Sequence, residues 1–437
     1  MLPQHLAPAL GALVLSSLLA CSASSPPSGS LVVRCGRLFD GVSDEVKTGV
    51  TVWIEGRRIR AVGTSVEVPR GTPELDLSGH TCLPGLIDLH THLTSVPEDT
   101  ADLRVFLTRT FEASVAVGRR SAQATLAAGF TTVRDVGTYL AFDEMTLRDE
   151  IEAGKTPGPR IQGAGAYLTI PGGGGDLLIP GVPEAEIPAV VRRGVARGAA
   201  AFAARAEDIA AGGADLLKVI ASGAVLAYGG VPGAPEMTPE ELAAVVVVAR
   251  RHGLKVAAHA HGAQSVREAI LAEADTIEHA SLIDEEGLAL ARERGTVLVM
   301  DVYNGDYIDT EGRRQGWPQE FLDKNLATTE EQRRRFTRAV ALGVAIGFGT
   351  DAAVFPHGDN ARQFRIMVER GMTPMAAIRS ATSVAAKAMG WEDRVGALVP
   401  GRFGDLIAVS GDPLAEVSLL EQVAAVVKGG EVVKERP

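Results

Sequence analysis

The chain begins and ends with one pattern, in which short apolar segments alternate with polar residues, glycine and proline. Near the start these segments cover residues 31–33, 49–54 and 58–62. Segments of this length between turn residues predict β-strands. The pattern returns at residues 405–409, 423–427 and 431–433. We therefore expect a small β-sandwich domain formed from both chain ends, residues 31–83 and 396–437.

The middle of the chain, residues 84–395, alternates short apolar strands with longer helical stretches such as 239–252 and 329–342. This alternation is typical of βα units around a parallel sheet. The eight strand candidates end near His92, Gly137, Gly165, Ile220, His261, Ala280, Tyr303 and Asp351. Eight such units predict a closed (β/α)8 TIM barrel, an α/β fold whose chemistry lies at the C-terminal ends of the strands.

Length and charge narrow the class of protein. A chain of 437 residues with 46% apolar content can build a large barrel and a smaller appended domain. The net charge of −11 argues against nucleic acid as a partner, because binding phosphates requires a basic surface. After the N-terminus, no apolar run is long enough to predict a membrane-spanning helix.

The first residues predict an export signal. An apolar run over residues 10–20 leads into Cys21, and serine, proline and glycine dominate from there to residue 30. We interpret residues 1–21 as a lipoprotein-type signal peptide and residues 22–30 as a flexible tether. The ending Leu-Leu-Ala-Cys resembles a bacterial lipoprotein processing site, which implies lipidation of Cys21 and anchoring at the periplasmic face of the outer membrane. The alternative is a buried first helix.

Two further cysteines, Cys35 and Cys82, both fall in predicted strands. Three cysteines do not make a disulfide scaffold. An oxidising periplasm would allow Cys35 and Cys82 to pair. We nevertheless interpret them as two buried free thiols.

Polar residues occur at the predicted C-terminal ends of several barrel strands. His90 and His92 are two residues apart on the first strand, so their side chains point to the same face. Five of the nine histidines lie at such ends, and Asp351 follows the eighth strand after two glycines that allow close backbone approach. The five are His90, His92, His259, His261 and His279. Clustered imidazoles and a carboxylate predict a site for divalent cations.

Lys218 lies inside the apolar fourth strand. A lysine there is costly unless its charge is paired or removed. One possibility is carboxylation by CO₂, which gives an anionic carbamate able to bridge two cations. The other is a salt bridge with a buried carboxylate.

The order His-x-His, Lys, His, His, Asp over strands one, four, five, six and eight resembles the binuclear metal-dependent amidohydrolase superfamily. The flanking segments 84–88, 349–351 and 401–406 match as well. Segments 218–223, 259–262 and 277–280 resemble its imidazolonepropionase-related branch. That branch includes exported dipeptidases and carboxypeptidases for Xaa-Pro, Xaa-Arg or Xaa-Lys dipeptides and N-acyl amino acids, and hydrolases of the ochratoxin A amide.

The resemblance implies hydrolysis of an amide or peptide C–N bond at two divalent cations, with zinc expected and CO₂ bound as a carbamate on Lys218. The implied metal ligands are His90, His92, Lys218, His259, His279 and Asp351. A hydroxide that bridges the cations would attack the carbonyl. Asp351 would carry its proton to the leaving amine, and Tyr228 would contact the oxyanion. Relatives commonly assemble, so a homo-oligomer acting on small molecules is expected.

The substrate residues suggested by position are Tyr228, His261, Arg134 and Asn304. His261 could instead replace His259 as a ligand, and Arg134 could form a buried salt bridge. Gly174 stands where relatives often carry a loop histidine. The rival functions are a cyclic amide or lactam hydrolase on the same site, and a binding lipoprotein without catalysis.

Overall fold

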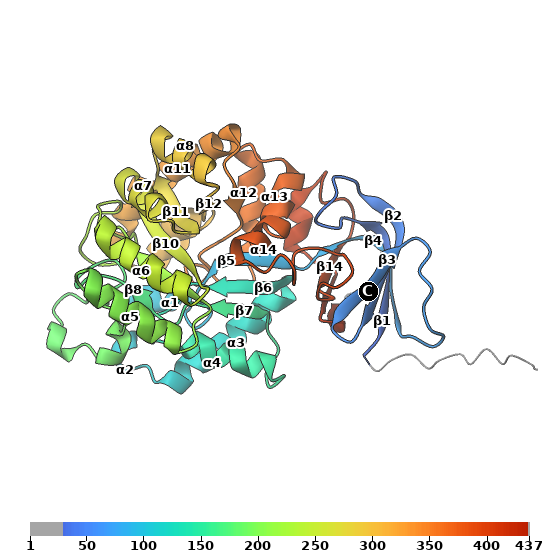
Figure 1. The fold of residues 1–437 in the computed structure, drawn as a ribbon, viewed down its shortest axis with the longest axis horizontal. Coiled ribbons are helices and arrows are strands. Elements are labelled where there is room, and N and C mark those ends of the chain that lie inside the picture. The colour runs from blue at the N-terminus through green and yellow to red at the C-terminus, as the bar shows by residue number, and fades with distance from the viewer. Residues whose placement is uncertain (1–28, 436–437) are drawn as a thin grey trace, which may run out of the picture.

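The computed structural model describes residues 29–435, which form a large α/β body with a smaller β domain beside it (Figure 1). The predicted signal peptide, Cys21 and most of the predicted tether lie outside the described residues. Within residues 29–435, no helix combines the length and the apolar character needed to span a membrane.

Strands from both chain ends form one sheet in the β domain, with the order β16-β15-β14-β4-β1-β2-β3. Its strands are β1 (Leu31–Leu38), β2 (Lys47–Glu55), β3 (Arg58–Gly63), β4 (Glu74–Pro84), β14 (Leu406–Val409), β15 (Ala425–Lys428) and β16 (Glu431–Glu435). Only β1 and β4 pair in parallel, and β4 joins the two ends of the chain by pairing with β14. Ile59 of β3 and Val427 of β15 share one apolar cluster, because the sheet folds over its own core.

The structure corrects the interpretation of the cysteines. Cys35 of β1 and Cys82 of β4 form a disulfide, with their Cα atoms 5.9 Å apart. Their strands are hydrogen-bonded neighbours, with a register shift between Cys35 and Arg37. This non-local pairing was not visible in the sequence, so the expectation of two free thiols was wrong. A disulfide is suited to an oxidising compartment, while export itself stays a prediction.

Nine short parallel strands occupy the eight predicted barrel positions, because the third position is split in two. They are β5 (Leu86–Thr91), β6 (Phe130–Asp135), β7 (Arg160–Gly163), β8 (Tyr167–Leu168), β9 (Leu216–Ile220), β10 (Lys255–Gly262), β11 (Thr276–Leu282), β12 (Val297–Val299) and β13 (Ile346–Gly347). The ladder is not continuous and gives a six-stranded sheet, β13 to β8, and a three-stranded sheet, β5-β6-β7. After β13, the Asp351 amide donates to the His90 carbonyl at 2.8 Å, which brings the first and last strands together.

Helices cover the outside of these strands. The longer ones are α3 (Phe111–Ala127), α4 (Asp143–Glu152), α5 (Ala199–Ala211), α6 (Pro239–Arg251), α7 (Ala263–Leu271), α8 (Glu285–Arg294), α11 (Gln319–Leu342), α12 (Gln363–Glu369), α13 (Pro374–Ser380) and α14 (Ser383–Met389). Shorter elements are α1 (Pro97–Ala101), α2 (Val105–Thr108), α9 (Asn304–Tyr307), α10 (Arg313–Gln315), η1 (Glu184–Glu186), η2 (Ala189–Arg192), η3 (Ile308–Gly312), η4 (Asn360–Arg362) and η5 (Val417–Glu421).

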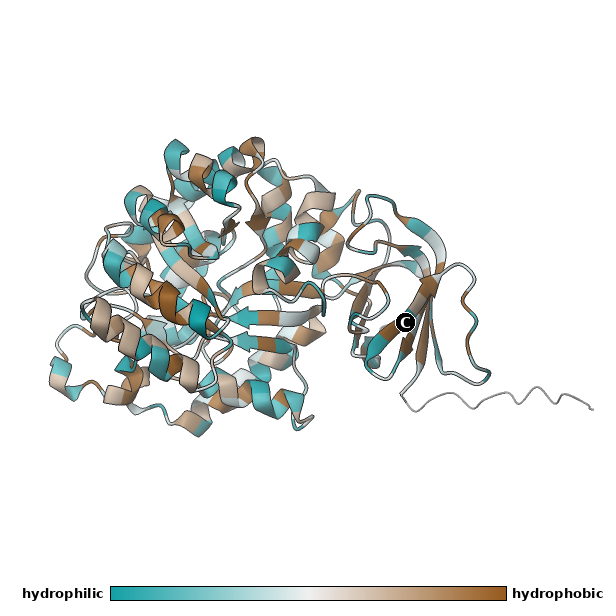
Figure 2. Cartoon of the chain, in the orientation of Figure 1, coloured by the Kyte–Doolittle hydropathy of each residue, from teal (hydrophilic) through white to brown (hydrophobic). Residues whose placement is uncertain are grey.

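The hydropathy of the strands changes along their length. Figure 2 shows hydrophilic colour at the arrowheads of β6 and β7, inside the barrel. For β6 this end carries Arg134 and Asp135, both fully within the protein. Charged groups at buried strand ends are costly without partners, so this end of the barrel is where chemistry is expected. The predicted α/β barrel with a small β-sandwich domain is confirmed.

We expect replacement of both Cys35 and Cys82 by alanine to lower the free energy of unfolding by about 2–4 kcal/mol, because the lost bridge closes a long loop. The bridge spans 47 residues. Urea unfolding of the oxidised wild type, the reduced wild type and the double variant measures this. Equal midpoints for all three proteins would contradict the disulfide.

Candidate metal centre

The predicted metal ligands come together in one cavity at the C-terminal ends of the barrel strands. Its lining includes His90, His92, Lys218, His259, His279 and Asp351, and also His261 and Asn304. They come from β5, β9, β10, β11 and the segments after β12 and β13. Their positions agree with the rule that TIM-barrel chemistry gathers at this face.

The ring nitrogens of the histidines are oriented by the protein. In four of the five, Nδ1 bonds to a carboxylate, carbonyl or hydroxyl oxygen. The pairs are His90 with Glu278 (2.9 Å), His92 with the Gly137 carbonyl (2.6 Å), His261 with Ser281 (2.8 Å) and His279 with Asp301 (3.0 Å). A histidine whose Nδ1 donates in this way keeps the Nε2 lone pair for a metal, which is the usual arrangement in metalloproteins.

The buried amine of Lys218 has no protein partner. Its side chain is 2% exposed, and Nζ makes no hydrogen bond. Burial lowers the pKa of this amine to about 8, although Glu278 opposes the shift. The carboxylate oxygens of Glu278 are taken by His90 and Arg134, at 2.9 and 2.7 Å. The alternative of a lysine paired with a buried carboxylate is therefore not what the structure shows.

Asp351 faces two of the histidines. Its Oδ1 lies 3.2 Å from His92 Nε2 and 3.5 Å from His90 Nε2, and Asn304 donates to Oδ2 at 3.4 Å. Burial alone would raise the pKa of Asp351, but the hydrogen bond and charge of His92, with His279 and Lys218, lower it. The carboxylate is thus kept ionised, the form that binds cations and accepts protons.

Backbone strain is concentrated at the same site. Asp351 has a φ of 61° and His279 a φ of 68°, both in the left-handed region that side chains rarely adopt. Strain of this kind persists where surrounding structure imposes it and is frequent at functional sites. Gly349 allows the close packing that this requires, since a Cβ there would lie 2.2 Å from Val299 Cγ1 and 3.0 Å from His90 Cβ.

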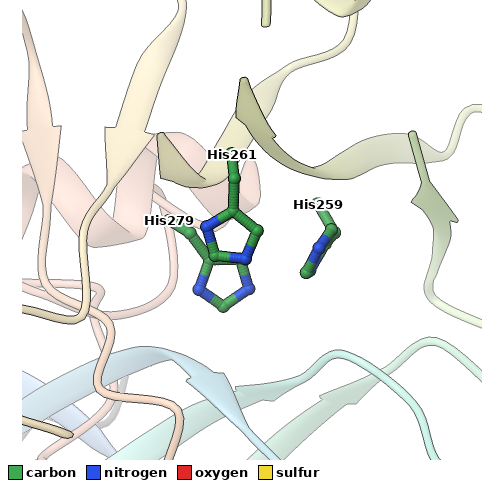
Figure 3. A group of neighbouring side chains, drawn as sticks. All are labelled: His259, His261 and His279. Atoms are coloured by element: carbon green, nitrogen blue, oxygen red, sulfur yellow. The ribbon is translucent and has the colours of Figure 1, made fainter. Parts of the chain in front are cut away.

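Two groups of side chains within residues 29–435 place their ligand atoms within 4.8 Å of one another. They are His259, His261 and His279 (Figure 3), and His90, His279 and Asp351. Imidazole nitrogens with a carboxylate suit zinc and other first-row divalent cations. The buried His259 Nε2 also lacks a protein partner, which is what a metal ligand without its ion would show. The residues present therefore fit a divalent metal.

Arg134 and Tyr228 do not line this cavity. Arg134 is buried, donating to the Leu89 carbonyl at 2.6 Å and to Glu278, so the structure favours the buried salt bridge over substrate contact. The Tyr228 ring packs against Phe321, with centroids 4.8 Å apart. A role for Tyr228 in holding the oxyanion stays a prediction.

Sequence reasoning missed several residues around the cavity. Tyr139 and Tyr167 line it, and the Tyr167 hydroxyl lies 3.3 Å from His92 Nδ1. Glu278 and Asp301 hold the two histidines described above. Glu278 had a signal like that of Lys218, since it is a charged residue inside a predicted barrel strand.

Gly174 also lines the cavity, and its amide donates to Glu236 at 2.8 Å. A Cβ at this position would lie 2.9 Å from Ala224 Cβ and 3.0 Å from the Ala224 amide nitrogen. A loop histidine here would require the neighbouring loop to move. Gly174 and Ala224 both line this part of the cavity, where neither carries a side chain longer than a methyl group.

We expect Glu278→Gln to lower zinc affinity by about 10–100-fold, because an amide replaces the carboxylate that orients His90. Isothermal titration of the metal-free protein measures the dissociation constant. Glu207→Gln is the matched control, since Glu207 contacts His252 at 2.6 Å on the surface. Equal affinities for both variants would rule out an orienting role for Glu278.

Comparison with known proteins agrees with this geometry. The Amidohydrolase family model matches residues 81–433. The ochratoxinase of Aspergillus niger is 29% identical over 94% of this chain and 88% of its own. A Xaa-Pro dipeptidase crystallised with methionine in its active site is 34% identical, with a TM-score of 0.85 over 92% of this chain and 99% of its own. A prolidase complexed with N-methylphosphonate-L-proline is 27% identical, with a TM-score of 0.86 over 93% and 100%. This chain therefore belongs to the Amidohydrolase family and is a hydrolase that acts on carbon–nitrogen bonds.

Proposed function

We propose that this chain hydrolyses the amide bond of a dipeptide or N-acyl amino acid whose side chains are uncharged. The observation that carries the proposal is the unpartnered Lys218 amine, buried among histidines and facing Asp351 in a cavity. Its amine would bond to the carbon of CO₂ and release one proton, giving a carbamate. The anion would be stabilised only together with the cations that it binds, and that pairing would remove the cost of an unpaired buried amine.

The carbamate oxygens would complete two cation sites. His90, His92 and Asp351 would hold one cation and His259 and His279 the other, with zinc suited to these nitrogen and oxygen donors. When bound, two divalent cations polarise the substrate carbonyl and lower the pKa of water into the neutral range.

Asp351 is the residue for proton transfer. The water oxygen bonds to the carbonyl carbon, its proton passes to the Asp351 carboxylate, and the C–N bond breaks as that proton moves to the departing nitrogen. The left-handed backbone at Asp351 and the contact of Oδ2 with Asn304 hold the carboxylate in place.

The walls of the cavity favour uncharged substrate groups. One side is apolar, with Leu103, Phe106, Leu226, Ile308 and Val354. Among the lining residues that the structure describes, Lys218 is the only lysine or arginine, and the acidic side chains are Asp301, Asp351 and Asp99.

Asp99 cannot pair with a cationic substrate side chain. Arg109 holds both of its oxygens, at 2.7 and 2.5 Å. Asp301 is likewise held, because Oδ1 contacts His279 and Gln332 and Oδ2 accepts from Asn304. The similarity to a Xaa-Pro dipeptidase, a proline-ligand prolidase and an ochratoxinase supports the same class of substrate.

We expect Lys218→Ala to abolish hydrolysis and to reduce bound zinc from two ions per chain to no more than one, since the bridging anion is lost. Elemental analysis and a dipeptide assay measure both. Added short carboxylic acids should restore part of the activity by supplying a carboxylate in the vacated space.

Lys255→Ala is the matched control for that experiment. Lys255 lies at the start of β10 and contacts Asp275 at 3.0 Å, away from the cavity lining. It should keep full activity and metal content. Full activity in Lys218→Ala would remove the bridging role and with it the proposed mechanism.

For substrates, we expect kcat/KM for Xaa-Pro, Xaa-Met and N-acyl-phenylalanine to exceed that for Xaa-Lys and Xaa-Arg at least about tenfold. A charged group without a partner in the cavity costs more than about 1.4 kcal/mol. The side chains of Met and Lys are close in length, so the comparison of Xaa-Met with Xaa-Lys measures the effect of the charge. Equal rates for the two would contradict an uncharged cavity, and cleavage of hydantoin or lactam rings alone would favour the cyclic amide alternative.

A further inference from the structure

His261 has no assigned role in the two-cation arrangement. It lies two residues after His259 on β10, so both side chains point to the same face of the strand. The neighbouring strand β11 carries His279. All three side chains are buried, with exposed fractions of 7% for His259, 4% for His261 and 6% for His279. Figure 3 shows the three rings projecting into one space.

The three rings are close enough to share one cation. Their ring centroids are 4.7 Å apart for His259 and His261, 4.6 Å for His259 and His279, and 4.7 Å for His261 and His279. One nitrogen from each lies within 4.8 Å of the other two. Three imidazoles around one zinc ion are a known coordination set, with an open fourth position for water or another ligand.

Two of the three rings are held from behind in the orientation that a ligand needs. Ser281 contacts Nδ1 of His261 at 2.8 Å, and Asp301 contacts Nδ1 of His279 at 3.0 Å. Asp301 also accepts from Gln332 at 2.8 Å, so it is fixed in turn. Outer partners of this kind set the free nitrogen and strengthen it as a ligand.

A role in substrate binding alone would not explain this cluster. Buried acceptors without a donor are costly, and His259 Nε2 is one of them. One nitrogen of each ring lies within 4.8 Å of the other two. A substrate group would satisfy one or two of them. A single cation satisfies all three.

We propose that His259, His261 and His279 hold one divalent cation by themselves, with Lys218 as a plain amine. The set contains neither Lys218 nor Asp351, so it needs no CO₂. The proposal shares His259 and His279 with the proposed function, but the cation at three imidazoles does not depend on hydrolysis.

The shared ligand His279 determines the order in which the two cations bind. It belongs to both candidate groups, so the two groups cannot each fill independently. With His279 engaged by the first cation, the second takes His90, His92 and Asp351 and requires the carbamate of Lys218. The chain thus has a one-cation state without CO₂ and a two-cation state with it.

The test measures metal content in the full chain carrying Lys218→Ala, loaded with Zn²⁺ or Co²⁺ alone. We expect about one ion per chain. For Co²⁺, we expect the absorption spectrum of a four-coordinate site with three nitrogen ligands. Adding His261→Phe, which keeps a ring but removes both nitrogens, should lower retention to near zero. His252→Ala, which removes a surface histidine, is the control and should retain one ion.

One retained ion in both Lys218→Ala and Lys218→Ala/His261→Phe would overturn the proposal, because the ion would then sit at His90, His279 and Asp351. No retained ion in Lys218→Ala would overturn it as well. Circular dichroism shows whether each variant is folded.

A milder variant covers the case in which the His261 substitution disturbs folding. Ser281→Ala in the Lys218→Ala background leaves His261 in place and removes the group that orients it. We expect zinc affinity to fall about 10–100-fold. Unchanged affinity would mean that His261 is not a ligand. Because the readout is metal binding, an inactive wild type with an intact three-imidazole site would disprove only the proposed function.

Discussion

The centre of this protein is organised around a positively ionisable amine that is buried without a counter-charge. Lys218 sits on β9 with Nζ unpartnered, while Glu278, the acid that most raises its pKa, is already engaged by His90 and Arg134. Burying an amine without a partner costs free energy, and the packing of its side chain does not offset that cost. Under the proposed function, CO₂ and divalent cations would supply the missing partner.

The hydrogen bonds that hold this site in place link different strands of the barrel. Glu278 on β11 holds His90 on β5 and Arg134 on β6, and Arg134 donates to the Leu89 carbonyl next to His90. One carboxylate therefore fixes three strands relative to one another. Buried polar networks that are fully satisfied stabilise a single arrangement, which a metal centre with narrow distance limits requires.

That the candidate ligands share one cavity could be predicted, because strand period and chain order depend on local sequence. The two-residue spacing of His90 and His92 puts both on one face in any strand. The partners were not predictable, because contacts such as Asp301 with His279 and Cys35 with Cys82 join segments whose adjacency only the fold decides. The first turns of α11, residues 319–328, were missed for a related reason: their buried face carries Asn325 and Thr328, polar side chains that line the cavity and conceal the helical period.

Electrostatics links the number of cations that the site can bind to whether Lys218 is an amine or a carbamate. A second cation placed beside an ammonium would be repelled in a medium that screens poorly, whereas a carbamate attracts it. By linkage, CO₂ must raise the affinity for the second cation by the same factor by which that cation raises the affinity for CO₂. If three imidazoles hold one cation, as proposed, only the second cation depends on this coupling. On that proposal, the arrangement of His261 beside His259 separates metal retention from the activation of the site.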